Sequence, residues 1–459
     1  MITLWYICPC HETTRHSTYL CWHHSQPGTL PYQVFQVSKV SLDNFIAWFV
    51  RRSAKACFAF DDRVHFVPPA APDSPIHLYV HIPFCVQLCP YCSFHRYAFE
   101  EKSVREYFKA LRQELQLYAR KGFRFSSVYL GGGTPTVLMD ELFETLAVIR
   151  DLFNPAEMSL ETNPDRLVNK ELTSLARAGV RRVSVGIQSF SDEILKAIGR
   201  YEKYGSGKGL ARKLKEALGS VETLNVDMIY NFPIQNSSML ENDLANLLDI
   251  LPDQVTFYPL MISQATRKQM EHIMGKVSQD KEREFYAMII SALEPLYQPN
   301  SAWCFSRGGS PMIDEYVVGG EEYVGAGSGA FGLVGGAIYA NTFSLAEYVS
   351  SLDSGRLPIK HRKVFSLHEM ARYRLLMTLF GLKLDLNSFR QRFGHSVWRV
   401  LAPEILFFIL AGALRITPGQ ISLTRRGRYF WVIMMREFFT GVDNFRDASR
   451  EAVDLCSGA

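Results

Sequence analysis

The stretch CVQLCPYC, residues 85–92, decides how the rest of this chain is interpreted, and we call it the Cys loop. It places three thiols, those of Cys85, Cys89 and Cys92, where they can point at one centre. Three thiolates hold three irons of a [4Fe–4S] cube, and no fourth cysteine stands at a matching distance to close the last iron. The alternatives are zinc, which usually requires CxxC pairs with a distant second pair, and buried structural thiols. The spacing favours a cluster with one open iron.

The composition is that of an ordinary globular protein and limits the function. At 459 residues, with 47% hydrophobic and 21% charged residues, the chain can bury a large core and is long enough for two domains. A net charge of +4 implies no polyanionic partner such as nucleic acid. Because the three clustered thiols demand a reducing compartment, the nine cysteines do not indicate a disulfide framework.

No stretch is typical of a targeting or membrane-spanning segment. The first residues lack the basic start and apolar run of a signal peptide. The most apolar stretch, residues 400–414, contains Pro403 and Glu404 and is too short to span a bilayer. These features predict a cytoplasmic protein.

The chain divides into five parts by composition and periodicity. Residues 1–50 show no clean periodicity; their cysteines and histidines could hold a metal, but a poorly ordered extension or an upstream start-codon artefact is the preferred interpretation. Residues 51–76 are expected to be a linker and residues 77–262 a catalytic core. Residues 263–360 are expected to complete the core and to supply substrate loops. Residues 361–459 are expected to form a mostly helical domain that resembles a winged helix and ends in a helix from Gly427 to Phe439.

The core is expected to be an α/β fold. Helical periodicity, as at Val104, Tyr107, Phe108 and Leu111, separates short strand-like runs. These runs begin near Leu78, Ser127, Met158, Arg182, Leu224 and Gln254. Six such repeats predict a parallel sheet with right-handed crossovers, and six units suit an incomplete (β/α)6 barrel rather than the closed eight-stranded one.

The unusual residues follow the carboxyl ends of these six strands, which is where parallel α/β folds build their sites. The segments concerned are the Cys loop and residues 131–136, 161–164, 186–190, 227–233 and 258–261. Two later segments, residues 301–307 and 323–331, are expected to be loops that return to the mouth of the barrel. The sequence therefore predicts one site assembled from all six strand ends.

Several residues at these ends have chemistry suited to ligands. The glycines of 131–133 let a ligand approach the backbone closely, although a tight turn is the alternative. Glu161 can accept hydrogen bonds from ribose or an ammonium, or cap a helix; Gln188 both donates and accepts. Arg200 can hold a carboxylate bidentately, unless it is a solvated surface side chain. Asp227 lies inside a buried strand, where a carboxylate is costly unless paired or bound.

With Tyr79-Val80-His81-Ile82-Pro83-Phe84 leading into it, the Cys loop resembles that of the radical S-adenosylmethionine (SAM) superfamily, in the branch of the oxygen-independent coproporphyrinogen III dehydrogenase. The resemblance runs from about Leu78 to Pro358. It implies a [4Fe–4S] cluster on three cysteines with SAM at the open iron, and a second SAM beside it. The residues it assigns to the first SAM are Tyr79, Tyr91, Gly132 and Glu161. Those it assigns to the second are Gly133, Thr134, Gln188, Arg200 and Asp227, with looser matches at Pro259 and Phe331.

Three departures bear on the place within this branch. The dehydrogenase has a further Cys where this chain has Phe94, the haem chaperone's HNxxYW motif is absent, and NFP at 231–233 replaces Gly-Leu-Pro. The stretches VDMIYNFP, QVTFYPLM, SAWCFSR and YVGAGSGAFG resemble instead the class C radical SAM methyltransferases, most of all those that methylate C8 of the menaquinone ring. That resemblance implies two SAM molecules, methylation of an sp2 ring carbon, and flavodoxin or ferredoxin as electron donor.

Other functions stay open beside this one. An anaerobic haem-degrading methyltransferase is a close alternative, and a cluster-bearing haem chaperone is an alternative of another class. DNA binding by the winged helix is disfavoured by its apolar face at residues 430–435. Tyr230, Tyr258 and Cys304 are candidates for the residue that takes a proton, or else wall residues. Residues 407–410 or 430–435 could contact the inner membrane surface, although domain core is the preferred interpretation.

Overall fold

The computed structural model describes residues 42–60, 72–308 and 322–457. The extension predicted for residues 1–50 therefore lies outside the described residues as far as residue 41. Its last residues are helical: α1 (Leu42–Cys57) runs through the expected boundary at residue 50 and into the expected linker. The helix forms because Ile46, Ala47, Val50 and Ala54 recur on one face, and all four are buried.

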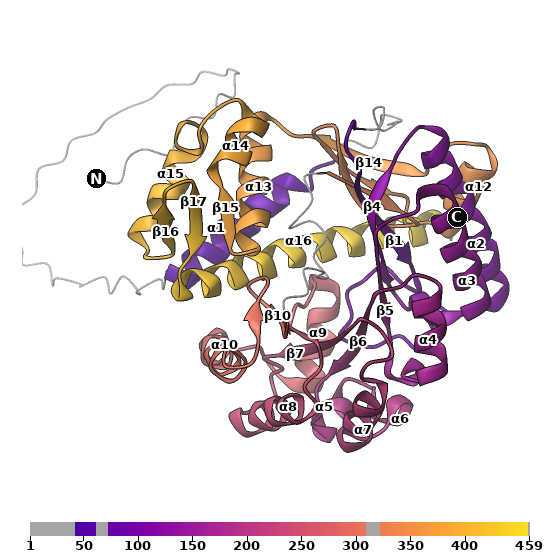
Figure 1. The fold of residues 1–459 in the computed structure, drawn as a ribbon, viewed down its shortest axis with the longest axis horizontal. Coiled ribbons are helices and arrows are strands. Elements are labelled where there is room, and N and C mark those ends of the chain that lie inside the picture. Colours follow the sequence, from indigo (N-terminus) through magenta and orange to yellow (C-terminus); the bar gives the residue numbers. More distant parts are fainter. Residues whose placement is uncertain (1–41, 61–71, 309–321, 458–459) are drawn as a thin grey trace, which may run out of the picture. The chain divides into compact units, whose positions relative to one another are not determined.

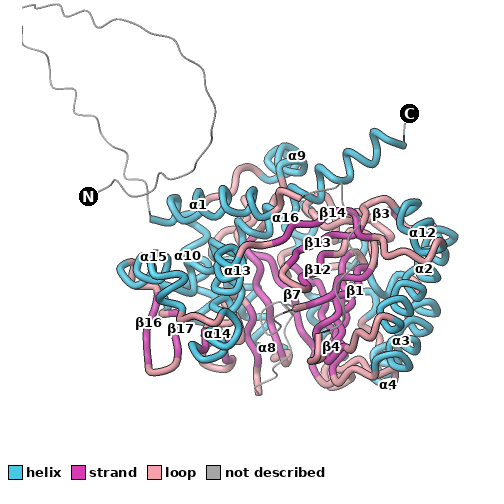
Figure 2. Tube along the Cα trace, turned by 90° about the horizontal axis from the view of Figure 1, so that it is seen from above, coloured by secondary structure: helices cyan, strands magenta, loops and turns pink. Residues whose placement is uncertain are grey.

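Six parallel strands form the centre of the fold and confirm the predicted core. They lie in chain order across the sheet and pair in parallel throughout. The strands are β1 (Ile76–Ile82), β4 (Phe125–Gly132), β5 (Glu157–Thr162), β6 (Arg182–Gln188), β7 (Thr223–Tyr230) and β8 (Gln254–Pro259). Three helices, α2 (Glu101–Arg120), α3 (Met139–Phe153) and α4 (Asn169–Arg177), lie on the outer side of these strands (Figure 2). Strand residues such as Leu78, Val80, Leu160 and Val226 are fully buried, which explains their near-continuous apolar runs.

The connections between these strands carry the remaining elements of the core. The helices are α2 (Glu101–Arg120), α3 (Met139–Phe153), α4 (Asn169–Arg177), α5 (Asp192–Ala197), α6 (Tyr201–Tyr204), α7 (Gly207–Ala217) and α8 (Ser237–Ile250). Two short 3-10 turns, η1 (Pro135–Val137) and η2 (Pro164–Arg166), follow β4 and β5. The short strands β2 (Phe84–Cys85) and β3 (Tyr97–Ala98) pair in parallel on either side of the Cys loop.

The sheet extends at both edges and does not close among the described strands. Beyond β1 come β11 (Tyr323–Ala326), β12 (Phe331–Val334), β13 (Ala337–Asn341) and β14 (Ile359–Val364); beyond β8 come β10 (Cys304–Ser306) and β9 (Gln298–Pro299). The segments expected as loops at 301–307 and 323–331 thus partly form the strands β10 and β11, which extend the sheet. Helices α9 (Gln264–Met274), α10 (Gln279–Leu293) and α12 (Leu345–Asp353) complete this region.

The C-terminal region is helical around a small sheet, as predicted. It comprises α13 (Leu367–Phe380), β15 (Lys383–Asp385), α14 (Leu386–Phe393), α15 (Val397–Leu410), β16 (Leu414–Thr417), β17 (Gln420–Leu423) and α16 (Arg425–Ser457). Helix α16 has 33 residues and continues well beyond the end expected near Phe439. Figure 1 shows it crossing from the small sheet toward the barrel, with α1 beside it. A Cβ atom at Gly441 would come within 2.9 Å of the Ala54 side chain, so these two helices pack closely.

The apolar segments considered for membrane contact are largely part of this packing. Residues 430–435 are all at most 5% exposed, so their side chains are core and cannot meet a membrane. In the other segment Leu410 is exposed, whereas Phe407 and Phe408 pack against the core. No helix in the described ranges combines the length and hydropathy needed to cross a bilayer.

Candidate functional site

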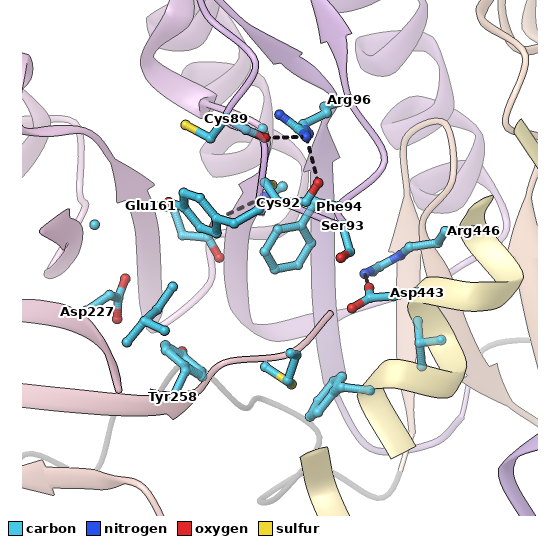
Figure 3. A pocket seen from close by; sticks show the side chains of 18 of the residues that line it. Cys89, Cys92, Ser93, Phe94, Arg96, Glu161, Asp227, Tyr258, Asp443 and Arg446 are labelled. Atoms are coloured by element: carbon cyan, nitrogen blue, oxygen red, sulfur yellow. Dashed lines mark hydrogen bonds and ion pairs between the residues drawn. The ribbon is translucent and has the colours of Figure 1, made fainter. Parts of the chain in front are cut away.

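A cavity of about 340 Å³ lies where the carboxyl ends of the parallel strands meet the middle of α16 (Figure 3). The structure brings nearly all the residues proposed from the sequence to its wall. These are Tyr79, Cys85, Cys89, Tyr91, Cys92, Gly132, Gly133, Thr134, Glu161, Gln188, Arg200, Asp227, Tyr258, Pro259 and Phe331. These residues meet at one cavity because parallel strands in register deliver their carboxyl ends to one side of the sheet.

The Cys loop is held in shape by its backbone. The guanidinium of Arg96 donates hydrogen bonds to the carbonyl oxygens of Cys89 (2.7 Å) and Cys92 (2.6 Å), as Figure 3 shows. The amide of Cys92 donates to the carbonyl of Cys89 at 3.3 Å. With their carbonyls turned to Arg96, the cysteines present their side chains to the cavity.

The three thiols have the surroundings that thiolate ligands require. Burial raises the pKa of the Cys92 thiol to about 11 and raises that of Cys85, so proton loss has to be coupled to metal binding. Donors offset this cost, since the Thr134 hydroxyl donates to the Cys85 sulfur at 3.5 Å and Arg200 reaches the Cys89 sulfur at 4.0 Å.

Within the described residues, no three His, Cys, Asp or Glu side chains are gathered as ligands of a single ion. The thiols of a cube bind three different irons and stand further apart than ligands of one ion. Cys85, Cys89 and Cys92 all lie at the wall of one cavity, which fits the three-thiolate ligand set of such a cube.

Residues 131–133, which we call the glycine segment, lie at the carboxyl end of β4 and pack against the strand that leads into the Cys loop. Gly132 has φ +114°, and a Cβ atom there would lie 2.5 Å from the His81 ring. A Cβ atom at Gly133 would lie 2.7 Å from the carbonyl oxygen of Phe84. Close backbone approach, rather than a tight turn alone, accounts for glycine at these positions.

The Glu161 carboxylate contacts the glycine segment. One carboxylate oxygen accepts from the Tyr129 hydroxyl at 2.6 Å and the other from the Gly132 amide at 2.9 Å. The carboxylate is thus oriented at the cavity wall and does not cap a helix. A carboxylate held in this way keeps acceptor capacity for a ligand hydroxyl or ammonium group.

A second group of polar residues also lines the cavity. Asp227 accepts from the Ser184 hydroxyl at 2.6 Å and from the Asn225 amide at 2.8 Å, which is the pairing that a carboxylate in a buried strand requires. Gln188 ends β6 with φ +75°, a conformation uncommon for a residue other than glycine. The pairing of β6 with β7 is irregular just before Gln188. This irregularity turns the Gln188 side chain toward the cavity, which it lines.

Arg200 is a buried cavity residue and not a solvated surface side chain. It is 4% exposed, donates to the carbonyl of Gly186, and lies 4.4 Å from the ring centre of Tyr204. Its Nε atom is buried and has no hydrogen-bond partner among the described residues. A charged group held in this way is positioned to meet an anionic ligand.

Two of the three proton-acceptor candidates do not line the cavity. Tyr230 and Cys304 are both fully buried and lie outside its wall. Strand side chains alternate between faces, so Ile229 lines the cavity while Tyr230 points toward Glu282 and Tyr286, which with burial raise its pKa. Tyr258 does line the cavity, 5.3 Å from Trp303 between ring centres.

Residues that the sequence did not indicate close the cavity. Five come from α16: Phe438, Phe439, Val442, Asp443 and Arg446. Phe58, which follows α1, also lines the wall, and its ring centre lies 5.4 Å from that of Phe438. The spacing of Phe438, Val442 and Arg446 is helical and would have revealed the continuation of the helix past residue 439.

The comparisons with known proteins agree with the fold. The family profile of the radical SAM superfamily matches residues 79–247, and that of the HemN C-terminal domain matches residues 365–430. The heme chaperone HemW of Bacillus subtilis is 26% identical over an alignment of 366 residues. The alignment covers 76% of this chain and 95% of the relative. An oxygen-independent coproporphyrinogen III oxidase of Paracoccus denitrificans is 27% identical over 417 residues, 84% of this chain and 90% of the relative.

A solved structure supports the same architecture. Coproporphyrinogen III oxidase (HemN) from Escherichia coli superposes with a TM-score of 0.69 at 20% identity, over 83% of this chain and 94% of that chain. At that identity the likeness concerns the fold. The relatives named here are heme chaperones and coproporphyrinogen oxidases, so they give no support to the methyltransferase expectation.

Proposed function

Because this chain belongs to the radical SAM superfamily, in the branch of the HemN- and HemW-type proteins, we propose that it is a cluster-bearing haem-binding protein of the chaperone type. Membership of the superfamily implies a [4Fe–4S] cluster and SAM. Cys85, Cys89 and Cys92 would hold the cluster, which when bound supplies an electron for SAM cleavage. Thr134 and Arg200 would lower the cost of the buried thiolates by donating to their sulfurs.

The observation that carries this proposal is the aromatic part of the cavity wall. It is made of flat side chains, those of Tyr258, Trp303, Phe331, Phe438 and Phe439. Aromatic faces gathered around one space favour a flat apolar ring. HemW, a chaperone named for heme, aligns over nearly its whole length with this chain, which supports a haem-type ring.

The haem iron would need a ligand of its own, since the HNxxYW motif is absent. Tyr258, Met261 and Met377 all line the cavity, and tyrosine and methionine are side-chain types that ligate haem iron in proteins. The proposal therefore requires no residue from outside the cavity.

The proposal is tested by anaerobic titration of the reconstituted protein with haem, followed by visible absorption. We expect saturable binding of one haem per chain, with no S-adenosylhomocysteine formed when SAM and reductant are added. Phe439→Ala, which removes part of the aromatic wall, should weaken binding about tenfold. Leu410→Ala, a change of an exposed residue outside the cavity, should leave it unchanged. Non-saturable binding in the wild-type protein would reject haem as the ligand.

A second candidate function is radical methylation of a ring carbon, with C8 of menaquinone as the acceptor. The polar group formed by Gln188, Arg200 and Asp227 favours it, because these residues line the same cavity as Glu161 and the Cys loop. They offer donors and acceptors to a second SAM beside the first, and proximity of two SAM molecules would be the catalytic device. Flavodoxin or ferredoxin would supply the electron.

This candidate makes a distinct prediction. Incubation with SAM, reductant and menaquinone should yield a quinone heavier by one methyl group, together with 5′-deoxyadenosine and S-adenosylhomocysteine. Asp227→Asn should lower methyl transfer while leaving the iron content unchanged. If no methylated quinone forms while haem binds stoichiometrically, the chaperone proposal stands alone.

A further inference from the structure

The inner part of α16 brings polar side chains to the cavity that no family profile covers. The match to the HemN C-terminal domain ends at residue 430, whereas Asp443 and Arg446 lie more than ten residues further along the same helix. Figure 3 shows both reaching from α16 toward Ser93 and Phe94, which directly follow the Cys loop. All four residues line the cavity.

Arg446 is held by aromatic faces and by one carboxylate. Its guanidinium lies 5.2 Å from the ring centre of Phe94 and 5.6 Å from that of Phe331. Its Nη1 donates to Asp443 at 3.0 Å, and the whole residue is only 8% exposed. The side chain is therefore fixed in position, with one nitrogen committed to the protein.

The other edge of this guanidinium is unsatisfied. The Nε atom of Arg446 is buried and has no hydrogen-bond partner among the described residues. Leaving a buried donor unpaired costs free energy, and the cost is larger for a charged group. A ligand that accepts from the Nε and Nη2 edge would recover this cost, and a carboxylate matches that edge bidentately.

Ser93 supplies a second donor of the same kind. Its residue is 5% exposed, and its hydroxyl is buried without a partner in the described part of the chain. Since Arg446 lies over the ring of the next residue, Phe94, the two donors face the same part of the cavity.

We propose that Arg446 and Ser93 form a carboxylate subsite that holds the acidic side chain of a flat ring ligand, with Phe94 and Phe331 as its apolar walls. This assignment rests on the proposed haem binding, and the carboxylate it names is a haem propionate. The methionine carboxylate of SAM has the same chemistry and is the other source. Asp443 orients the guanidinium by occupying Nη1, so that the free edge faces the ligand.

The test compares haem with haem dimethyl ester, in which both propionates are blocked, by titration of the reconstituted protein. The wild-type protein should bind the free acid at least tenfold more tightly than the ester. Arg446→Gln should abolish this preference and Ser93→Ala should reduce it. Arg428→Gln is the matched control, because Arg428 lies on the same helix, pairs with Glu294 and does not line the cavity. SAM affinity is measured for each variant, and circular dichroism verifies folding.

The outcomes separate the subsite from the haem proposal. If the wild-type protein binds haem and its ester equally, or if Arg446→Gln keeps the preference, the subsite is wrong and haem binding stands. If neither ring binds and Arg446→Gln weakens SAM binding tenfold, haem is wrong and the subsite serves SAM. If neither ring binds and SAM affinity does not change, both assignments fail. If Arg446→Gln does not fold, the same comparison is made with Ser93→Ala, which changes the segment after the Cys loop. A reduced preference for the free acid then supports the subsite, and an unchanged preference rejects it.

Discussion

Gly133 lies directly against the backbone of Phe84, the residue before the Cys loop, and leaves no space for a side chain. A Cβ atom there would lie 2.7 Å from the carbonyl oxygen and 2.8 Å from the amide nitrogen of Phe84, next to Cys85. Gly133→Ala should therefore displace the start of the Cys loop, lowering stability by about 1–3 kcal/mol and reducing the iron bound after reconstitution. Iron analysis and urea unfolding measure both effects.

Gly209→Ala is the control for this prediction. Gly209 lies in α7, where an added Cβ meets only the Ser206 hydroxyl at 3.5 Å, and alanine favours a helix. It should keep full iron content. Equal iron content in Gly133→Ala and Gly209→Ala would show that the close approach at Gly133 does not shape the Cys loop.

The assignment of the cluster to three cysteines predicts that substitutions in the Cys loop and substitution of a cysteine elsewhere differ sharply in their effect on cluster assembly. Alanine at Cys85, Cys89 or Cys92 should each prevent assembly of a complete cluster, because three thiolates are the minimum set. Cys304→Ala is the matched control, since the Cys304 thiol is buried and lies outside the cavity. Iron and sulfide analysis of the reconstituted variants distinguishes them. A complete cluster in any one of the three loop variants would contradict the assignment.

Single-residue reasoning from the sequence was most specific where burial makes a charge costly. Asp227 could be singled out because a carboxylate inside a buried strand needs a partner or a ligand, and it lines the cavity. The same reasoning failed for Tyr230 and Cys304, because the face to which a strand residue points depends on a register that the sequence does not reveal. Ser93 and Arg446 gave no signal, since a missing hydrogen-bond partner becomes visible only in three dimensions.

At the level of elements, α8 holds the loop that follows β6. Its residue Asp243 accepts from the Ser189 hydroxyl at 3.0 Å and from the Phe190 amide at 2.6 Å, next to Gln188 of the cavity. Burial raises the pKa of the Asp243 carboxyl from 3.8 to about 7. The folded state thus binds this proton more tightly than the unfolded state, and the stability contributed is lost as the pH rises from about 4 to about 7.

Asp243→Asn removes this proton uptake. The free energy of unfolding of the variant relative to the wild type should rise with pH in that window, by at most about 1.4 kcal/mol per pH unit. The comparison between variants is essential, because burial lowers the pKa of His81 to about 3 and that group changes stability in the opposite direction. Urea unfolding from pH 4.5 to 7.5 measures the difference. A difference that stays constant or falls with pH would show that Asp243 is not buried as described.

Helix α16 is attached to α10 through a buried ion pair. Glu282 is fully buried and accepts two hydrogen bonds at 2.5 Å from the Nη1 of Arg436. Arg436→Met would leave Glu282 buried and unpaired and should cost about 3–5 kcal/mol. The double variant Glu282→Leu/Arg436→Met should cost much less, because no charge is left unpaired. Urea unfolding of both variants tests this, and equal losses would mean that the two groups do not act as a pair.

At the scale of the whole molecule, the sequence predicted the core more completely than the closure of its mouth. Six alternations of strand and helix could be recognised because each has its own periodicity, and all six strands pair in the expected order. Closure by α1 and α16 depends on two segments far apart in sequence. Their close packing at Ala54 and Gly441 comes from tertiary fit, which local periodicity does not encode.

The most direct test of a cluster with an open iron is electron paramagnetic resonance of the reconstituted, reduced protein before and after addition of SAM. Three cysteine ligands would leave one iron open to SAM, and Glu161 and the glycine segment line the same cavity as the three cysteines. We therefore expect SAM to shift the g values of the reduced cluster. A complete cluster whose spectrum SAM does not alter would contradict binding of SAM at an open iron.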